Sequence, residues 1–319
     1  MNEPRIFRIG TRGSALALWQ SNTVLGRLAV PARIHEIVTS GDRFRDIPLQ
    51  GGAQTGFFTK EIEERLLSGE VDLAVHSLKD LPTSQPPGLL VAACLERAPV
   101  SDLLIVHPDW LDANALFPVR EGCIVGAGSL RRQALVRLYG SQARPALIRG
   151  NVPTRLRKCA TAEYGAVLLA RAGVERLGLD LRGLSVFEMN AEVWLPAPGQ
   201  GAVAVEVRSD DAEATAAVRA IDHAATHAAV KLERDLLVRF EGGCHTAFGA
   251  LAAPVEGGWR VRIGIDRGEA GWGQMTFEGP REQCAALSPR DIESFIPLRV
   301  AQPEALRRPA RLTSEGTLL

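Results

Sequence analysis

The chain has 319 residues, more than a usual single domain, so two or three domains with separate cores are expected. Lys plus Arg and Asp plus Glu both number 37, and the resulting net charge of zero excludes a whole-molecule attraction to nucleic acid or an anionic membrane. No apolar run approaches the roughly 20 residues that span a bilayer, and no signal-peptide core is present. The five cysteines are odd in number and form no CxxC pair, which indicates reduced thiols without disulfides or a metal site. We expect a cytoplasmic protein without nucleic-acid or membrane partners.

The first two thirds of the chain alternate short β-branched runs with amphipathic stretches. This pattern is typical of βα units that feed a mainly parallel sheet, so the predicted fold class is α/β. The expected strands are residues 5–9, 34–39, 72–75, 89–93, 102–106, 124–126, 146–148, 166–169 and 203–207.

Two segments resemble each other locally. Residues 9–16 and 125–132 both read as a strand, a glycine-rich turn, a serine N-cap and a helix. They predict two lobes built alike, each with a helix N-terminus and free backbone N–H groups where anions bind. Neither turn has the third glycine of a GxGxxG motif, which argues against an NAD-dependent enzyme.

The remaining segments predict how the lobes are connected and completed. Residues 194–201 hold two prolines and two glycines before an apolar strand, as a crossover and hinge between lobes would. From His223 a long amphipathic helix runs to about Glu241, and antiparallel strands at 247–252, 259–265 and 274–278 follow.

Three domains follow from this pattern. Domain 1 is expected over residues 1–98 and 199–221, domain 2 over 99–198, and a smaller α+β domain with an antiparallel sheet over 222–319. The glycine-rich residues 39–58 are expected to form a mobile lid, and residues 311–319 a frayed tail.

Six arginines lie in or beside predicted turns and helix starts at the carboxyl side of strands, the ligand side of such sheets. A guanidinium binds carboxylates with two hydrogen bonds and keeps its charge when partly buried, so the group favours a polycarboxylate ligand. The alternative, intramolecular salt bridges, is the better interpretation of any single arginine. The six are Arg12, Arg131, Arg132, Arg149, Arg155 and Arg157.

An apolar strand ends abruptly in a polar stretch at residues 75–82. Lys79 and Asp80 should alternate in direction along the strand, so that one faces a cleft and the other is anchored locally. Taken alone, an ordinary ion pair at the strand end is the better interpretation, and His76 is expected to be a packed residue rather than a catalyst.

Cys244 lies on a glycine-flanked loop after a helix, where its thiol is exposed. The negative end of the helix dipole opposes thiolate formation there, so attachment to an already reactive electrophile is easier to justify than a nucleophilic role. The other cysteines are expected to be small buried residues. They are Cys94, Cys123, Cys159 and Cys284.

In this order and spacing, the segments resemble the porphobilinogen deaminase (hydroxymethylbilane synthase) family from Arg5 to about Ala250. The residues that carry the resemblance are 10–20, 75–83, 128–133, 148–152, 154–156, 198–202 and 241–244.

The resemblance implies three α/β domains, the first two related to the lobes of periplasmic solute-binding proteins. It implies a transferase that joins four porphobilinogen molecules head to tail, with release of ammonia, to give hydroxymethylbilane for tetrapyrrole (haem) biosynthesis. The growing chain is primed on a dipyrromethane cofactor attached to Cys244 by a thioether. A monomer that passes its product to the next enzyme of the pathway is expected.

The resemblance also assigns roles to residues of this sequence. Asp80 is implied as the principal catalytic carboxylate. The implied cofactor-binding residues besides Cys244 are Ser77, Lys79, Asp80, Ser129, Arg131, Arg132 and Arg155. The implied substrate-binding residues are Arg12, Ser14, Phe58, Arg149, Arg155 and Arg176.

Three departures from the family pattern put loop stiffness and rate in doubt. Residues 51–56 lack the usual lid lysine, Ala247 stands near a usual proline, and Pro153 replaces a small or polar residue at a helix start, where a proline is tolerated. The main alternative function is a non-enzymatic two-lobed module that holds a small organic anion, because a fold does not decide function. The combination of Lys79 and Asp80 with Cys244 argues against that alternative.

Overall fold

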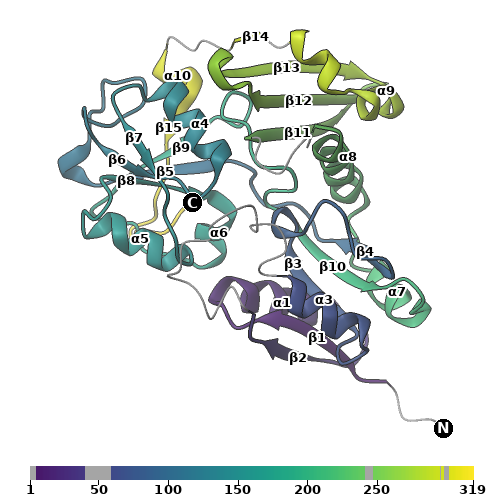
Figure 1. Ribbon diagram of the computed structural model, residues 1–319. Coiled ribbons are helices and arrows are strands. Elements are labelled where there is room, and N and C mark those ends of the chain that lie inside the picture. Colours follow the sequence, from purple (N-terminus) through teal and green to yellow (C-terminus); the bar gives the residue numbers. More distant parts are fainter. Residues whose placement is uncertain (1–4, 40–58, 241–246, 295, 298–301) are drawn as a thin grey trace. The chain divides into compact units, whose positions relative to one another are not determined.

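The computed structural model describes residues 5–39, 59–240, 247–294, 296–297 and 302–319 (Figure 1). The chain divides into two compact units, Met1–Ala98 with Gly199–Lys231 and Pro99–Pro198 with Leu232–Leu319. One passage between the units falls between Pro198 and Gly199, within the segment predicted as a crossover. Of the predicted lid, residues 40–58 lie outside the described residues.

The first unit contains a five-stranded sheet in the order β2-β1-β3-β10-β4. β1 pairs in parallel with β2 and β3, whereas β10 is antiparallel to both β3 and β4. The strands are β1 (Phe7–Arg12), β2 (Ala32–Ile37), β3 (Leu73–Ser77), β4 (Leu89–Cys94) and β10 (Val203–Arg208), and the helices include α1 (Ala15–Arg27), α3 (Lys60–Leu67) and α7 (Ala212–Arg219).

Helices cover both faces of this sheet, and the side chains that point to each face are buried against them. Val24 of α1 packs with Ile9 and Val75, and Leu66 of α3 packs with Ala74 from the other face. β3 therefore lies between two helical layers, as expected for a strand that is apolar over nearly its whole length.

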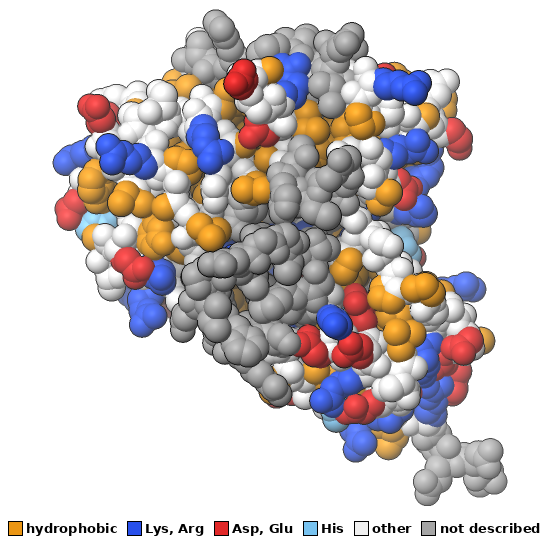
Figure 2. Space-filling view, viewed as in Figure 1, with side chains coloured by type: hydrophobic (Ala, Val, Ile, Leu, Met, Phe, Trp, Pro, Cys, Tyr) orange, Lys and Arg blue, Asp and Glu red, His pale blue; other side chains and the backbone are white. Residues whose placement is uncertain are grey.

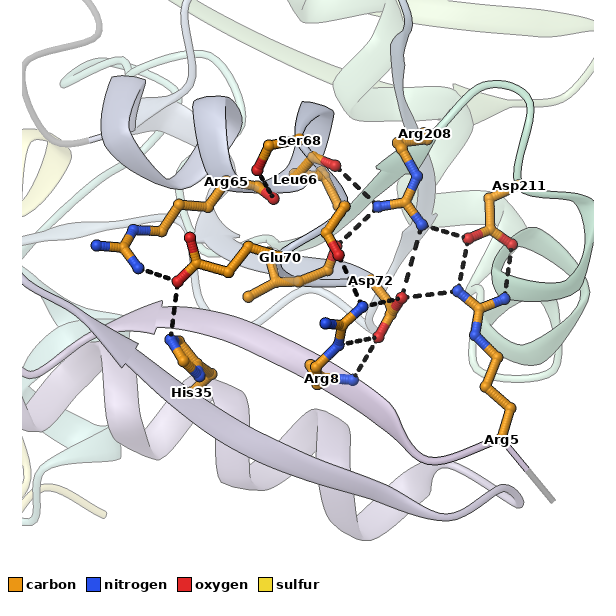
Figure 3. Close-up of polar contacts among 12 residues, drawn as sticks. Arg5, Arg8, His35, Arg65, Leu66, Ser68, Glu70, Asp72, Arg208 and Asp211 are labelled. Atoms are coloured by element: carbon orange, nitrogen blue, oxygen red, sulfur yellow. Dashed lines mark hydrogen bonds and ion pairs between the residues drawn. The ribbon is translucent and has the colours of Figure 1, made fainter. Parts of the chain in front are cut away.

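A network of ion pairs joins elements of the first unit (Figure 3). Asp72, directly before β3, accepts hydrogen bonds from Arg5 Nη2 over 2.7 Å and Arg8 Nε over 2.9 Å. Asp211, the N-cap of α7, accepts from Arg5 Nη2 over 2.8 Å and from Arg208 Nη2 over 2.7 Å. Although burial opposes ionisation of Asp72, the two arginines hold its pKa well below its usual range. These charges connect β1, β3, β10 and α7.

The second unit contains a six-stranded sheet in the order β15-β9-β5-β8-β6-β7. β6 pairs in parallel with β7 and β8, and β5 is antiparallel to β8 and β9. The strands are β5 (Asp102–Val106), β6 (Ile124–Gly126), β7 (Arg144–Ala146), β8 (Ala166–Ala170), β9 (Ser185–Met189) and β15 (Arg307–Pro309), and the helices include α4 (Leu130–Tyr139), α5 (Val152–Ala160) and α6 (Arg171–Arg176).

The two sheets share one topology. The first sheet has the order β2-β1-β3-β10-β4, and the second, read from its other edge, has the order β7-β6-β8-β5-β9, followed by β15. In both, the second, first and third parallel strands along the chain are followed by one antiparallel strand and then by the fourth parallel strand. The antiparallel strand, β10 or β5, is the first after the chain enters that unit from the other one. The predicted α/β class with two lobes built alike is confirmed, and the inserted strands make both sheets mixed.

The predicted antiparallel sheet near the C-terminus is also confirmed. β11 (Phe248–Val255), β12 (Gly258–Asp266), β13 (Trp272–Gly279) and β14 (Ile296–Pro297) are antiparallel neighbours. Leu236 and Phe240 of α8 (Ala224–Phe240) pack on one face of this sheet, and α9 (Arg281–Ala286) contributes Cys284. The division into three domains, with 222–319 as the third, stays a prediction.

The expectation of a frayed C-terminal tail is wrong. After α10 (Pro303–Leu306), β15 pairs with β9, and Leu312 forms a bridge with Leu318. Leu312 and Leu318 pack against the core of the second unit, because burial removes their apolar side chains from water.

Basic and acidic side chains are interspersed on the face shown in Figure 2. Within the ranges given above, no helix has both the length and the apolar character needed to cross a membrane.

Candidate active site

The polar stretch after β3 forms a turn. β3 ends at Ser77, and Leu78–Asp80 form one turn of 3-10 helix. Lys79 is half-buried and its Nζ donates to Gln200 Oε1 over 3.2 Å. Asp80 is exposed, and its carboxylate makes no hydrogen bond or ion pair with another residue in the described part of the chain. The expected alternation along a strand is wrong because the strand has already ended at Ser77, and Lys79 contacts Gln200, a residue distant in the sequence.

The neighbouring strand β1 brings further predicted residues to the same edge. β1 and β3 are parallel, so Arg12 at the end of β1 and Ser77 at the end of β3 lie on one side of the sheet. Gln20 Nε2 donates to Ser77 Oγ over 2.8 Å, and Ser14 caps α1 by accepting from the Ala17 backbone N–H over 3.3 Å. The first unit thus places Arg12, Ser14, Ser77, Lys79 and Asp80 at the carboxyl edge of its parallel strands.

His76 is a packed residue, as expected. Its Nε2 lies 3.5 Å from Glu206 Oε2, and both side chains are buried. Burial and the nearby carboxylate of Glu206 raise the pKa of Glu63 on α3. These buried side chains come from α3, β3 and β10.

In the second unit, an arginine lies against the N-terminus of α4. Ser129 caps this helix by accepting from the Arg132 backbone N–H over 3.3 Å, and the first N–H groups of a helix have no partner within it. A Cβ on Gly128 would lie 2.6 Å from Arg155 Nη1, so only glycine leaves room for the guanidinium there. Arg155 Nε also donates to the Gly150 carbonyl over 2.7 Å. The positive helix end and a guanidinium together favour an anion at this turn.

Two other predicted arginines differ in their environments. Arg149 is half-buried, and its guanidinium makes no hydrogen bond or ion pair with any other residue whose position is described. Arg176 ends α6, and burial lowers its pKa to about 10. Arg157, by contrast, is exposed on α5. Pro153 lies in the first turn of α5, where its missing N–H costs no hydrogen bond, as predicted.

Arg131 and Arg132 are buried and share one carboxylate, Asp102 of β5. Both side chains therefore form internal ion pairs, which was the alternative interpretation for any single arginine. These three side chains together carry a net charge of +1, and among the described residues Arg131 Nε is buried without a hydrogen-bond partner. Burial lowers the pKa of Arg131. The arrangement suits a further anionic group near this cluster.

The sequence reasoning missed Asp102 and the buried Gln200. The signal for Asp102 was an acidic residue opening the otherwise apolar segment 102–106, because a buried carboxylate requires a cationic partner. Gln200 was quoted only within the crossover motif, although a polar side chain at a buried position must also have partners.

The four described cysteines are buried free thiols, as predicted. Burial raises the pKa values of Cys123 and Cys159 to about 12, so neither supplies a thiolate near neutral pH. Cys244 and Phe58 lie outside the described residues.

Residues 7–216 match the family described as porphobilinogen deaminase, dipyrromethane cofactor binding domain. Porphobilinogen deaminase from Nitrobacter hamburgensis is 46% identical over 289 residues, which cover 88% of this chain and 89% of that protein. Porphobilinogen deaminase from Brevibacillus brevis is 41% identical, covering 77% of this chain and 79% of that protein. Among solved structures, a putative periplasmic sulfonate-binding protein from Methylobacillus flagellatus matches 75% of this chain and 70% of its own, at 13% identity and a TM-score of 0.41. That structural similarity is too low to support an argument. On the extent of the sequence matches, the chain belongs to the porphobilinogen deaminase family.

Proposed function

We propose that the chain condenses four porphobilinogen molecules head to tail, with release of ammonia, to give hydroxymethylbilane. Besides family membership, one observation carries the proposal: the exposed carboxylate of Asp80 follows Lys79, which Gln200 anchors. A reactive carboxylate on a fixed turn at the carboxyl edge of a parallel strand is typical of α/β enzymes.

The chemistry asks for a carboxylate at the reacting centre. Loss of ammonia from porphobilinogen leaves a cationic pyrrole, and a nearby carboxylate stabilises developing positive charge and accepts a proton. Asp80 has these properties because neither of its oxygens is engaged by the protein groups described above. Asp80 is therefore the catalytic residue of the proposal.

Each porphobilinogen also brings an acetate and a propionate group. Arg149, whose guanidinium is not engaged by described protein groups, and Arg155, at the α4 N-terminus, supply donors for such carboxylates. Arg12, Ser14 and Arg176 complete the proposed substrate-binding set, with Phe58 from the undescribed segment.

The residues present also fit a dipyrromethane cofactor attached to Cys244. The three side chains of Asp102, Arg131 and Arg132 carry a net charge of +1, and Arg131 Nε has no partner in the described part of the chain, which suits a carboxylate-bearing group. When bound, this cofactor supplies the pyrrole carbon to which the first substrate is joined. Besides Asp80 and Cys244, the proposed holding residues are Ser77, Lys79, Ser129, Arg131, Arg132 and Arg155.

The proposal includes a cytoplasmic monomer that passes its product to the next enzyme of tetrapyrrole synthesis. The buried free thiols of the described cysteines agree with a reducing compartment.

The amount of ammonia released per tetrapyrrole formed, measured during turnover of porphobilinogen, tests this proposal. The wild-type protein should release four ammonia molecules per tetrapyrrole. Asp80→Asn should lower the rate by about 10²- to 10⁴-fold, whereas Asp109→Asn, which changes another exposed aspartate, should not. Binding of porphobilinogen without ammonia release would instead support the small-anion-binding module.

A further inference from the structure

Among the described residues, Trp194 is the largest fully buried side chain, and it lies in the segment that leads to the crossover between the units. Its ring stacks on Phe117, with centroids 5.9 Å apart, and lies tilted to Tyr139 at 6.1 Å. Its indole Nε1–H donates to Asp102 Oδ2 over 3.0 Å. A buried indole N–H needs an acceptor, and here that acceptor is the carboxylate shared by two arginines.

Three described side chains donate four hydrogen bonds to Asp102. Besides Trp194, Arg131 Nη2 donates over 2.9 Å, and Arg132 donates from Nε over 3.1 Å and from Nη2 over 2.7 Å. A carboxylate offers about four lone-pair directions, so this set fixes its orientation. Charge-assisted bonds of this kind fix the guanidinium planes as well.

Backbone carbonyls complete the orientation of the two arginines. Arg131 Nη1 donates to the Leu195 carbonyl over 2.5 Å, and Arg132 Nη1 donates to the Leu168 carbonyl over 3.0 Å. Arg131 Nε is buried and has no hydrogen-bond partner among the residues that the structure describes. Because Leu195 directly follows Trp194, the orientation of Arg131 and the start of the crossover segment are fixed together.

We propose that Asp102, held by Trp194, is the positioning residue that aims Arg131 and Arg132 at a carboxylate of the bound pyrrole chain. The inference rests on the proposed function, which supplies that carboxylate. Asp102 acts through the two arginines and does not itself touch the ligand.

Electrostatics alone predicts the opposite effect of removing the Asp102 charge. Asp102→Asn changes the net charge of the cluster from +1 to +2, which strengthens the attraction for an anion. If Asp102 acts by orienting the arginines, the same substitution weakens binding despite the added positive charge. The direction of the change therefore distinguishes positioning from charge balance.

The test follows loading of apoprotein prepared in cells that do not make porphobilinogen. Porphobilinogen is titrated, the two-pyrrole gain in intact mass is recorded, and KM and kcat of the loaded fraction are measured. Outer residues that orient metal ligands are worth about 10- to 100-fold in affinity, and we expect Asp102→Asn to need about tenfold more porphobilinogen for half-loading. Loading of this variant at the wild-type concentration or below overturns the positioning role.

Two further variants keep the test decisive. Glu188→Gln removes another carboxylate that pairs with two arginines of the same unit, and it should lower the unfolding midpoint without changing the half-loading concentration. Trp194→Phe keeps an aromatic ring but removes the N–H, and it should raise the half-loading concentration in the same direction as Asp102→Asn. If Asp102→Asn does not fold, Trp194→Phe decides, and wild-type loading by that variant overturns the proposal. A wild-type protein that never gains two pyrroles refutes the proposed function instead.

Discussion

The ammonium group of Lys79 donates a hydrogen bond to the side-chain oxygen of Gln200, with 3.2 Å between the two atoms. Gln200 is fully buried and follows the crossover at Pro198, whereas Lys79 belongs to the turn that ends at the exposed Asp80. A buried amide from a segment distant in the sequence thus anchors the turn that presents the proposed catalytic carboxylate.

Loss of this anchor should lower turnover. Gln200→Leu keeps a similar volume but removes the acceptor, so the turn at Asp80 becomes less fixed. One hydrogen bond is worth about 1 kcal/mol, and we expect kcat to fall roughly fivefold, measured with saturating porphobilinogen. Gln142→Leu, which removes an amide that donates to the Phe117 carbonyl, is the control and should leave kcat unchanged. Equal losses in both variants would indicate a general effect on folding.

A methyl group at Gly128 should displace the guanidinium of Arg155. The added Cβ would lie 2.6 Å from Arg155 Nη1, the mobile end of a long side chain, so the fold can adjust while the anion site cannot. Gly128→Ala should raise KM for porphobilinogen about tenfold, as expected for the loss of about 1.4 kcal/mol of binding. Gly26→Ala is the matched control, because its Cβ meets nothing within 4 Å on α1. An unchanged KM for Gly128→Ala would remove Arg155 from substrate binding.

The ion pairs around Arg5 should make stability depend on pH below about 4. The hydrogen bond from Arg5 lowers the pKa of Asp211 to about 2. A carboxyl with a lower pKa in the folded state stabilises the protein above the pKa of the unfolded chain, and this contribution is lost as pH falls from about 4 to about 2. We expect about 1 to 2 kcal/mol at pH 7, after allowing for the partly exposed Arg5.

Urea unfolding of Asp211→Asn at several pH values measures this contribution. Asparagine is an equally good N-cap for α7, so the substitution removes mainly the charge. The variant should be less stable than the wild type at pH 7, and the difference should disappear as pH falls below about 2. Asp210→Asn, at the neighbouring exposed position, should follow the wild type throughout. A constant difference between Asp211→Asn and the wild type at every pH would contradict the assignment.

Much of the fold could be predicted from local pattern. Strands β5 and β6 occupy the predicted residues because both are apolar runs bounded by turns. β7 begins two residues before its predicted position, since Pro145 argues against a strand although an edge strand tolerates a proline. β9 was not predicted because Glu188 interrupts its apolar pattern, and only the tertiary structure shows the arginines that pair with that residue.

Site residues that belong to local motifs could be predicted from the sequence, whereas contacts between residues distant in the sequence could not. The turn at Asp80 and the N-cap Ser129 follow from the local sequence. The contact of Trp194 with Asp102 joins residues 92 positions apart, and no local pattern encodes such a contact. Buried polar partners of this kind depend on how β5, α4 and the crossover segment pack together.

Attachment of a two-pyrrole cofactor to Cys244 can be measured from the intact mass of the purified wild-type protein beside Cys244→Ala, with an acidic aldehyde colour test for pyrroles on both. We expect a two-pyrrole excess mass and colour in the wild type after incubation with porphobilinogen, and neither in Cys244→Ala. A wild-type mass that stays equal to the sequence mass after that incubation would rule out the covalent cofactor and favour a module that only binds small anions.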